Sequence, residues 1–439
     1  MPGRKLRWTL GILALLLVVA LAAPFLVPVS RFIPEIERVA SQKLGQPVEI
    51  AELRLSILPT PRVVAHGIRV GKADLAKIGE LEIVPELKSF LSGPRALRLV
   101  RAQKVELEEA ALGIPGAMPK GAGEALELRR LVLKQVQLKH SKVKLPEFDL
   151  EADLGPGYSV EQARFESRDG LKARLAPQGG GISSIELEGR NWTLPVGAPL
   201  TFERLLARGR LRGEQLDLPD VEAALYGGTL TGHVRVDWAK QWQIGGEAKI
   251  AGVDLVPVQR ALAKPARLSG RLKAEPRFSA QAKSPELLGA ALALDGPFEV
   301  VGGAYQGVDL SKVADITGSK SAQDATHFEQ FTGKLELRGE RVRINELCVR
   351  SPKLQAGGFI QIEPDETLSG RLDVALARTS GFVSVPVALS GKASDPTIRP
   401  TKGYVLGAVV GSVLLPGIGT AGGASVGSRI EGGAGGGCK

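Results

Sequence analysis

Residue types that could support catalysis are sparse and scattered in this sequence. Gly423–Gly427 matches the G-x-S-x-G elbow that presents a nucleophilic serine, and the four histidines are His66, His140, His233 and His327. The hydrolases that use this elbow place their histidine base after the serine, but no histidine follows His327. No histidine has a second His, Cys or carboxylate at metal-ligand spacing. We therefore expect a protein that is not an enzyme, with no catalytic residues, no metal and no cofactor.

The two cysteines give little sign of a disulfide framework. Cys348 lies between Leu347 and Val349, where it is expected to pack as a small hydrophobe. Cys438 lies one residue before the end of a glycine-rich tail and is expected to be a free thiol.

The N-terminus carries a strong membrane signal. Arg4, Lys5 and Arg7 precede an uncharged, mostly aliphatic run from Trp8 to Ser30, and about 20 such residues cross a bilayer as a helix. Positive charge before the span places the N-terminus in the cytoplasm and the rest of the chain outside it. The aliphatic residues assigned to this anchor are Leu10, Ile12, Leu13, Leu15, Leu16, Leu17, Val18, Val19 and Leu21.

A cleaved signal peptide is the alternative to a retained anchor. Leu21-Ala22-Ala23 offers the small residues of a cleavage site, but the apolar run continues to Val27. Signal peptides usually have an apolar region of about 7–15 residues, so the longer run favours the anchor.

Beyond the anchor the apolar residues mostly alternate with polar ones. Runs such as Leu53–Ile57, Leu335–Leu337 and Val342–Ile344 show a period of two, which predicts strands with one apolar and one wet face. Glycine, aspartate and proline separate these runs, as in antiparallel meanders. Helices are expected at 34–45, within 74–92, at 257–264 and at 284–294. The sequence therefore predicts a mainly β, elongated body with few short helices.

The C-terminal segment 403–428 has no charged residue and is rich in glycine. Gly403, Gly407 and Gly411 would give a helix a flat face for close packing, and Pro416 divides the run. Two readings stay open, a hairpin that inserts into a membrane and an apolar tail packed on the protein.

Several local strings, in this order, resemble the AsmA-like family of bacterial envelope proteins. Gly45–Ile50 leading to Leu58–Val63 looks like the N-terminal module of that family. Leu225–Gly232 is similar to its Tyr-Gly-Gly strand signature, and Gly307–Leu310 to its Gly-x-Asp-Leu unit. The residues that carry these two motifs are Tyr226, Gly227, Gly228, Gly307, Asp309 and Leu310.

The resemblance implies an anchor in the bacterial inner membrane, crossing it once, that holds a curled, groove-like antiparallel sheet in the periplasm. It divides the chain into a cytoplasmic tip and anchor (1–30), an AsmA-type module of helix and strands (31–110), a divergent β-rich middle (111–200), an AsmA-like β region (201–402) and a glycine-rich tail (403–439).

The function expected from this resemblance is non-enzymatic handling of phospholipid or another acyl-chain lipid for outer-membrane biogenesis. A net charge of +10 favours anionic surfaces such as inner-membrane head groups, whereas an aromatic content of 5% argues against nucleic acid. The alternative is a tethered scaffold that assists outer-membrane protein assembly through an envelope protein partner, without carrying lipid. The alternating residues expected to line the groove are Leu335, Leu337, Val342, Ile344, Leu372, Val374 and Leu376.

Overall fold

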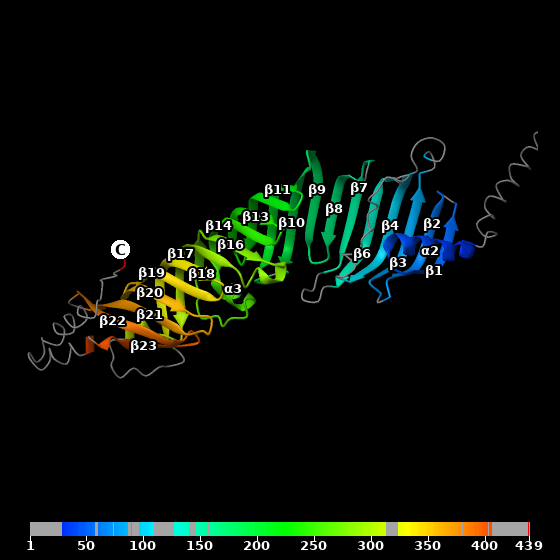
Figure 1. Cartoon of the computed structure of the whole chain (residues 1–439). Helices are drawn as coiled ribbons and strands as arrows, with labels where there is room; N and C mark the ends of the chain where they lie inside the picture. Colours follow the sequence, from blue (N-terminus) through cyan, green and yellow to red (C-terminus); the bar gives the residue numbers. More distant parts are fainter. Residues whose placement is uncertain are drawn as a thin grey trace, which may run out of the picture. The chain divides into compact units, whose positions relative to one another are not determined.

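The computed structural model describes residues 29–57, 60–72, 74–86, 89, 96–108, 127–139, 146–156, 159–195, 197–312, 324–378, 381–402, 404–405 and 438 (Figure 1). The chain divides into two units, Met1–Leu187 and Glu188–Lys439, and the boundary falls within strand β10 (Ile182–Thr193). Strands make up most of both units, which confirms the prediction of a mainly β protein.

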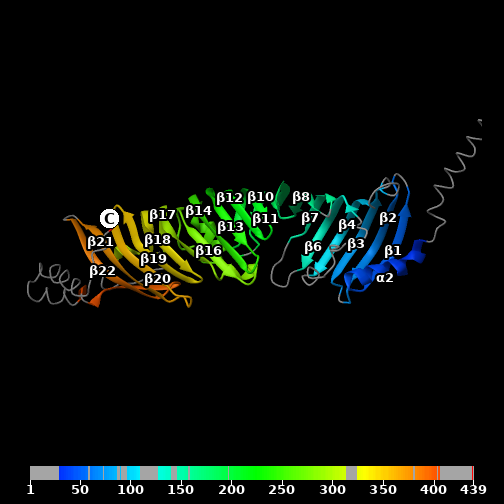
Figure 2. The same ribbon diagram turned by 45° about the horizontal axis from the view of Figure 1, so that its top comes forward.

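The N-terminal unit consists of a short helical segment followed by a sheet. Its helices are η1 (Val29–Phe32) and α2 (Ile33–Leu44). Its strands are β1 (Val48–Ser56), β2 (Arg62–Val70), β3 (Ala76–Pro85), β4 (Ala96–Glu108), β5 (Glu127–Leu128), β6 (Arg130–Lys139), β7 (Phe148–Leu154), β8 (Val160–Ser167) and β9 (Leu171–Gly179). The helix lies against β1, and Ile33, Ala40 and Leu44 pack on the apolar cluster of the first three strands (Figure 2).

Strand β4 departs from the predicted antiparallel order on one of its two sides. β4 and β6 run parallel, with Val105 opposite Val136. A parallel pair needs a connection of about a dozen residues or more, and the glycine-rich segment 109–126, outside the described residues, supplies that length. The short β4–β5 pair is also parallel, whereas β1–β2, β2–β3, β3–β4, β6–β7, β7–β8 and β8–β9 are antiparallel.

The C-terminal unit is a second run of strands with one short α-helix. Its strands are β11 (Thr201–Arg212), β12 (Gln215–Leu225), β13 (Gly228–Asp237), β14 (Trp242–Asp254), β15 (Arg271–Ala274), β16 (Arg277–Ala282), β17 (Ala293–Gln306), β18 (Ala325–Arg338), β19 (Arg341–Ser351), β20 (Leu354–Ile362), β21 (Leu368–Arg378), β22 (Gly381–Lys392) and β23 (Asp395–Pro400). The helical pieces are α3 (Leu255–Ala261), η5 (Pro285–Leu287) and η6 (Leu310–Lys312). Neighbouring strands are antiparallel, and the long β14 pairs with both β15 and β16.

Two of the four predicted helices are confirmed and two are not. The helix at 34–45 is α2, which ends at Leu44 and is capped by Gly45 with a left-handed φ of 64°, and the helix at 257–264 is α3. The prediction of helical turns within 74–92 was wrong for Ala76–Pro85, which forms β3 because Leu81 and Ile83 alternate with polar residues. Within 284–294 only η5 is helical; a turn follows it and β17 begins at Ala293.

The core of the C-terminal unit is a row of inward side chains in register across its strands. This core row contains Val253, Leu272, Val300, Phe331, Val349, Ala356, Val374 and Val385, each opposite the next on a neighbouring strand. Val300, Ala356, Val374 and Val385 are fully buried. Packing of this kind stabilises the sheet by about 1.5–3 kcal/mol for each fully buried aliphatic side chain.

Candidate functional site

A second row of inward side chains in the C-terminal unit is apolar but only half-buried. This apolar row runs Leu218, Val234, Gly246, Phe278, Leu294, Leu337, Val342, Ile362 and Leu368, from β12 to β21. Each member is the register partner of the next, and none of the members of the row is charged. Leu218 and Leu368 are buried at its ends, whereas the members between them remain partly accessible.

The apolar row is long enough to hold an alkyl chain. Eight inter-strand steps of ~4.8 Å give a path of roughly 38 Å along the sheet. An acyl chain in a bilayer occupies half of a hydrocarbon core ~30 Å thick, about 15 Å. The row therefore exceeds one acyl chain in length.

Gly246 leaves room in this row for the ring of Phe278. A Cβ placed on Gly246 would lie 2.9 Å from Cζ of Phe278 and 2.1 Å from the carbonyl oxygen of His233. The neighbouring Gly245 has its nearest such contact at 3.6 Å. The glycine at 246 thus lets two strands and an aromatic ring approach closely on the inner face.

At the C-terminal end of this unit the inner face surrounds an apolar cavity of about 220 Å³. Side chains from both β17 and β23 line it, so the sheet curls far enough here for those two strands to face one cavity. The lining comprises Leu268, Tyr305, Val308, Leu310, Thr326, Phe328, Phe331, Ile344, Leu347, Val349, Ile360, Ile362, Leu368, Leu372, Leu389, Ala393, Pro396 and Ile398. Ile362 and Leu368 belong to both the cavity and the apolar row, which makes the two features continuous.

The cavity presents very little hydrogen-bonding capacity to an occupant. Thr326, one of two polar residues in its lining, donates to the carbonyl oxygen of Val308 (2.8 Å) and accepts from the amide of Leu310 (3.0 Å). Its hydroxyl is therefore engaged within the wall. A buried polar ligand would lose its hydrogen bonds to water here without replacement, so the site favours hydrocarbon.

The Gly-x-Asp-Leu motif builds part of this cavity wall. Gly307 has a φ of 91°, and Asp309 accepts hydrogen bonds from the amide and hydroxyl of Ser311 at the start of η6. This turn directs Val308 and the buried Leu310 into the apolar cluster. The motif residues act structurally, by shaping the wall.

The same four residue types occur earlier in the chain, a repeat that sequence reasoning missed. Gly252–Leu255 reads Gly-Val-Asp-Leu, as Gly307–Leu310 does, and also ends a long strand before a helical segment. Asp254 caps α3 by accepting from the amide of Val256 (2.9 Å). Both copies therefore place an aspartate cap after a glycine with positive φ and direct a valine and a leucine inward.

The Tyr-Gly-Gly motif forms the hairpin between β12 and β13. Tyr226 and Gly227 have φ values of 50° and 70°, as a tight two-residue turn requires. The Tyr226 hydroxyl accepts from the amide of Thr201 (3.0 Å). A Cβ on Gly228 would lie 2.5 Å from the amide nitrogen of Val253, so this position accepts only glycine without backbone movement.

The structure places the predicted groove residues in distinct groups on the inner face. Leu337 and Val342 are adjacent in the apolar row, and Leu335 faces Ile344 one step along the same strands. Ile344 and Leu372 line the cavity, whereas Val374 and Leu376 are buried in the cluster next to it.

The N-terminal unit has a comparable inner row of its own. It runs Leu53, Ala65, Leu81, Ala102, Leu133, Leu150, Phe165 and Ala173 across β1 to β9. Leu53, Ala65 and Ala102 are buried, while Leu133, Leu150 and Phe165 are half-buried. Taken by itself, this unit also presents aliphatic side chains that are partly open to solvent.

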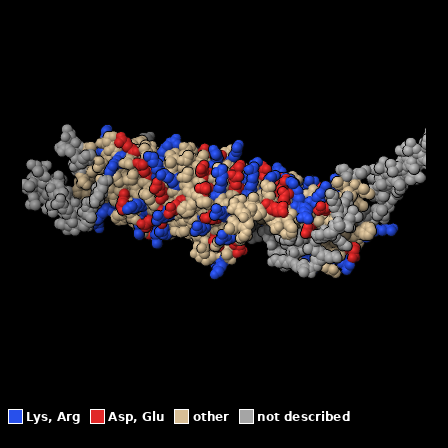
Figure 3. Space-filling view, turned by 90° about the horizontal axis from the view of Figure 1, so that it is seen from above, with Lys and Arg blue, Asp and Glu red and all other residues tan. Residues whose placement is uncertain are grey.

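In the strands of the C-terminal unit, positions next to the inward residues carry charged side chains that pair with one another. Figure 3 shows Lys and Arg side chains interspersed with Asp and Glu side chains across one face of the molecule. Glu299 accepts hydrogen bonds from Gln330 (2.6 Å) and Lys273 (3.3 Å), and these two bonds, that from Gln330 foremost, hold the pKa of the Glu299 carboxyl below its ordinary value. Lys273, Glu299 and Gln330 each stand next to a member of the core row, so this polar cluster lies on the face opposite the two rows.

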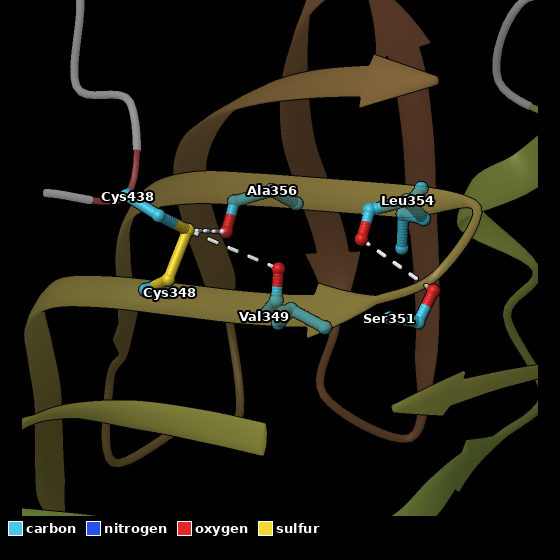
Figure 4. The surroundings of a disulfide bond; sticks show 6 residues. All are labelled: Cys348, Val349, Ser351, Leu354, Ala356 and Cys438. Carbon is cyan, nitrogen blue, oxygen red and sulfur yellow. Dashed lines mark hydrogen bonds between the residues drawn. A yellow bond between two sulfur atoms is a disulfide. The ribbon is translucent and has the colours of Figure 1, made fainter. Parts of the chain in front are cut away.

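The expectation of unpaired cysteines was wrong. Cys348 of β19 forms a disulfide with Cys438, with the two Cα atoms 5.3 Å apart (Figure 4). The Cys438 sulfur lies 3.5 Å from the carbonyl oxygen of Ala356 and 3.9 Å from that of Val349; a bridged sulfur has no proton to donate, so these are contacts only. The sequence separation of 90 residues hid this proximity.

Several predicted features lie outside the described residues. The anchor residues fall within 1–28, and almost all of the 403–428 tail is also outside. Among the described residues no helix is both long and apolar enough to cross a bilayer. Within the same ranges no group of three His, Cys, Asp or Glu side chains is placed to hold a metal ion.

Comparison with family models, curated proteins and solved structures finds no match for this chain. The apolar row, the cavity and the sequence are therefore the features from which a function can be inferred.

Proposed function

We propose that this protein binds phospholipid or another acyl-chain lipid on the inner face of its sheet and is not an enzyme. The observation that carries the proposal is the half-buried apolar row, continuous from Leu218 to Leu368 and joined to an apolar cavity. A contiguous apolar patch that is accessible to solvent marks a site for binding a ligand, a membrane or another protein. A lining of aliphatic and aromatic side chains, with Tyr305 and Thr326 as its polar members, suits an alkyl chain.

The cavity sets the size of what it holds. An engineered cavity of ~150 Å³ in another protein binds benzene, so about 220 Å³ accommodates a short part of an alkyl chain. A whole lipid therefore lies along the apolar row, with one end of a chain in the cavity and the polar head at the solvent edge of the strands.

The proposed setting is the periplasmic side of a bacterial inner membrane, with the N-terminal run as anchor. The charge pattern around Trp8–Ser30 supports this orientation. The disulfide between Cys348 and Cys438 supports it independently, because disulfides persist in oxidising compartments and are rare in the cytosol. The resemblance to AsmA-like proteins favours outer-membrane lipid homeostasis as the role.

The test measures the lipid that the purified full chain retains after extraction in mild detergent. Native mass spectrometry would count bound phospholipids for the wild type, for Leu337→Asp in the apolar row, and for Ser279→Asp as control. Ser279 is exposed on β16 beside Phe278 but is not a member of the row. A carboxylate against hydrocarbon costs at least ~1.4 kcal/mol, so we expect Leu337→Asp to reduce retained lipid about tenfold or more.

The comparison between the two variants separates cargo from lipid held around the anchor. Lipid bound at the anchor is unaffected by either substitution, whereas lipid on the row is lost only in Leu337→Asp. Equal retention by all three proteins would refute the proposal. In that case the tethered scaffold for outer-membrane protein assembly would remain, and crosslinking in the envelope would be expected to capture a protein partner.

A further inference from the structure

Helix α2 has two apolar faces, and the sheet covers only one of them. Ile33, Ala40 and Leu44 pack on the first strands of the N-terminal unit. Phe32, directly before the helix, is 55% exposed, and Ile36 and Val39 are 39% and 40% exposed. Positions i, i+4 and i+7 share one side of a helix, so these three side chains form a continuous apolar stripe.

This stripe departs from what a surface helix normally presents to water. The solvent face of such a helix is polar, and large exposed hydrophobic residues elsewhere in the described chain, such as Val160 and Phe359, occur singly on their elements. Three on one short helical segment indicate a surface that is covered in the functional state.

Hydrogen bonds fix which side of α2 faces the sheet. Glu37 accepts from the amide of Ile50 (2.7 Å), and Ser41 accepts from the amide of Val48 (2.9 Å). These bonds hold the helix against β1, so rotation cannot bury the stripe in the protein. The stripe therefore remains available to an external partner.

The sequence immediately before the helix identifies that partner. The uncharged run ends at Ser30, two residues before Phe32, and two residues span at most ~7 Å. If the run crosses the bilayer, the stripe begins at the membrane surface. A bilayer is the one apolar partner that the anchor holds permanently beside this helix.

The charges around the stripe fit a helix that lies in the interface. Arg31 and Lys43 are exposed at its two ends, where they can reach anionic head groups. Arg38 forms a salt bridge with Glu35, and this pairing offsets the negative charge of Glu35. Interfacial helices combine such basic residues with apolar side chains buried about 5–10 Å into the head-group region.

We propose that α2 lies on the bilayer surface with Phe32, Ile36 and Val39 inserted between the lipid head groups. Because Glu37 and Ser41 fix α2 to β1, this contact also sets the orientation of the N-terminal sheet on the membrane. The inference depends on the anchored state of the proposed function and is independent of any lipid cargo.

The test uses nitroxide labels on the full chain reconstituted into vesicles of phosphatidylethanolamine and phosphatidylglycerol. The native cysteines are joined in a disulfide, so a thiol-reactive label modifies only an introduced cysteine. Ile36→Cys and Val39→Cys report on the stripe, and Gln42→Cys, exposed on the same helix, is the control. Accessibility to oxygen, which concentrates in lipid, is compared with accessibility to a water-soluble nickel chelate.

We expect a several-fold higher ratio of oxygen to nickel accessibility at positions 36 and 39 than at position 42. Equal ratios at all three positions would place the stripe in water and overturn the proposal. Protection of positions 36 and 39 from both reagents would also overturn it, because protein would then cover the stripe.

A fourth label separates this inference from the proposed function. Leu16→Cys lies in the predicted anchor and should be accessible to oxygen and protected from nickel. If Leu16→Cys is in lipid but positions 36 and 39 are in water, only the docking of α2 fails. If Leu16→Cys is itself in water, the anchored state fails, and the docking of α2 fails with it.

Discussion

Cys438 is bonded to Cys348 across 90 residues of sequence, and this bond returns the end of the chain to the middle of β19. Cys348 is the register partner of Thr332, whereas its neighbours Leu347 and Val349 line the cavity. Side chains alternate between the faces of a strand, so the disulfide lies on the face opposite the cavity. It holds the chain terminus without occupying the apolar site.

Replacing both cysteines should lower the stability of the C-terminal unit. The crosslink closes a long loop in the unfolded chain, and loss of such a bond typically costs about 2–5 kcal/mol. Urea unfolding of Cys348→Ser/Cys438→Ser and of the wild type would measure the difference. The wild type should show no reactive thiol after denaturation without reductant, and one or two thiols per chain would show that the bond is absent.

The alternation of Leu335 and Leu337 with charged residues was sufficient to predict a strand with an apolar face. The sequence alone does not say which strand lies next to which, because register depends on contacts between distant segments. Leu337 and Val342 meet across a short hairpin and could be paired locally, whereas Phe278 meets Leu294 only because β14 pairs with two shorter strands. The apolar row therefore became visible only with the fold.

Other departures have equally specific causes. The parallel β4–β6 pair follows a long connection that hairpin reasoning does not anticipate. The two Gly-Val-Asp-Leu copies, at 252–255 and 307–310, were the one overlooked signal present in the sequence itself. Their shared role as capped turns that carry inward side chains requires the structure.

Gly246→Ala should destabilise the protein, whereas Gly245→Ala should not. The Cβ at 246 would meet the His233 carbonyl oxygen at 2.1 Å, and crowding of this kind costs about 1–3 kcal/mol. At 245 the nearest atom would be 3.6 Å from the added Cβ. Because alanine also has less conformational entropy than glycine in the unfolded chain, the free energy of unfolding should stay the same or rise slightly. Thermal unfolding of both variants checks this pair, and equal melting temperatures would contradict it.

Gln259 should be important for the segment that lines the cavity at Leu268. Its amide nitrogen donates to the carbonyl oxygens of Leu255 (2.8 Å) and Leu268 (2.5 Å). Its amide oxygen accepts from the amides of Arg267 (3.0 Å) and Leu268 (3.1 Å). Gln259→Met keeps the length of the side chain but removes all four hydrogen bonds. We expect the free energy of unfolding to fall by about 2–3 kcal/mol.

Hydrogen exchange provides the local measurement for Gln259. The amide of Leu268 should exchange at least ~10-fold faster in Gln259→Met, because its acceptor is gone. The amide of Arg267 also donates to the carbonyl oxygen of Pro265 (2.9 Å), so its exchange should accelerate less. Arg260→Met, at an exposed position on the same helix, should leave both rates unchanged. Unaltered protection of the Leu268 amide in Gln259→Met would rule out the role assigned to the side chain.

Stability of the N-terminal unit should fall on the acid side because of Glu151 and on the alkaline side because of Lys134. Lys134 Nζ lies 2.9 Å from a Glu151 oxygen and 3.1 Å from an Asp149 oxygen. The hydrogen bond from Lys134 lowers the pKa of Glu151, and the bond to Glu151 raises the pKa of Lys134. A carboxyl group whose pKa is lowered by folding stabilises the folded state above about pH 4.3, and this stabilisation is lost as the pH falls. A lysine whose pKa is raised by folding stabilises the folded state below about pH 10.4, and this stabilisation is lost as the pH rises.

Lys134→Met should therefore raise the pKa of Glu151 toward its ordinary value. It should also lower the free energy of unfolding at neutral pH by about 0.3–1 kcal/mol, which is small because both side chains are about a third exposed. A carboxyl-carbon NMR titration measures this pKa directly. Lys139→Met is the reciprocal control, since Lys139 lowers the pKa of Glu106 through its own hydrogen bond of 2.9 Å. Lys134→Met should raise the pKa of Glu151 and not that of Glu106, and Lys139→Met should do the reverse. An unchanged Glu151 titration in Lys134→Met would disprove the coupling.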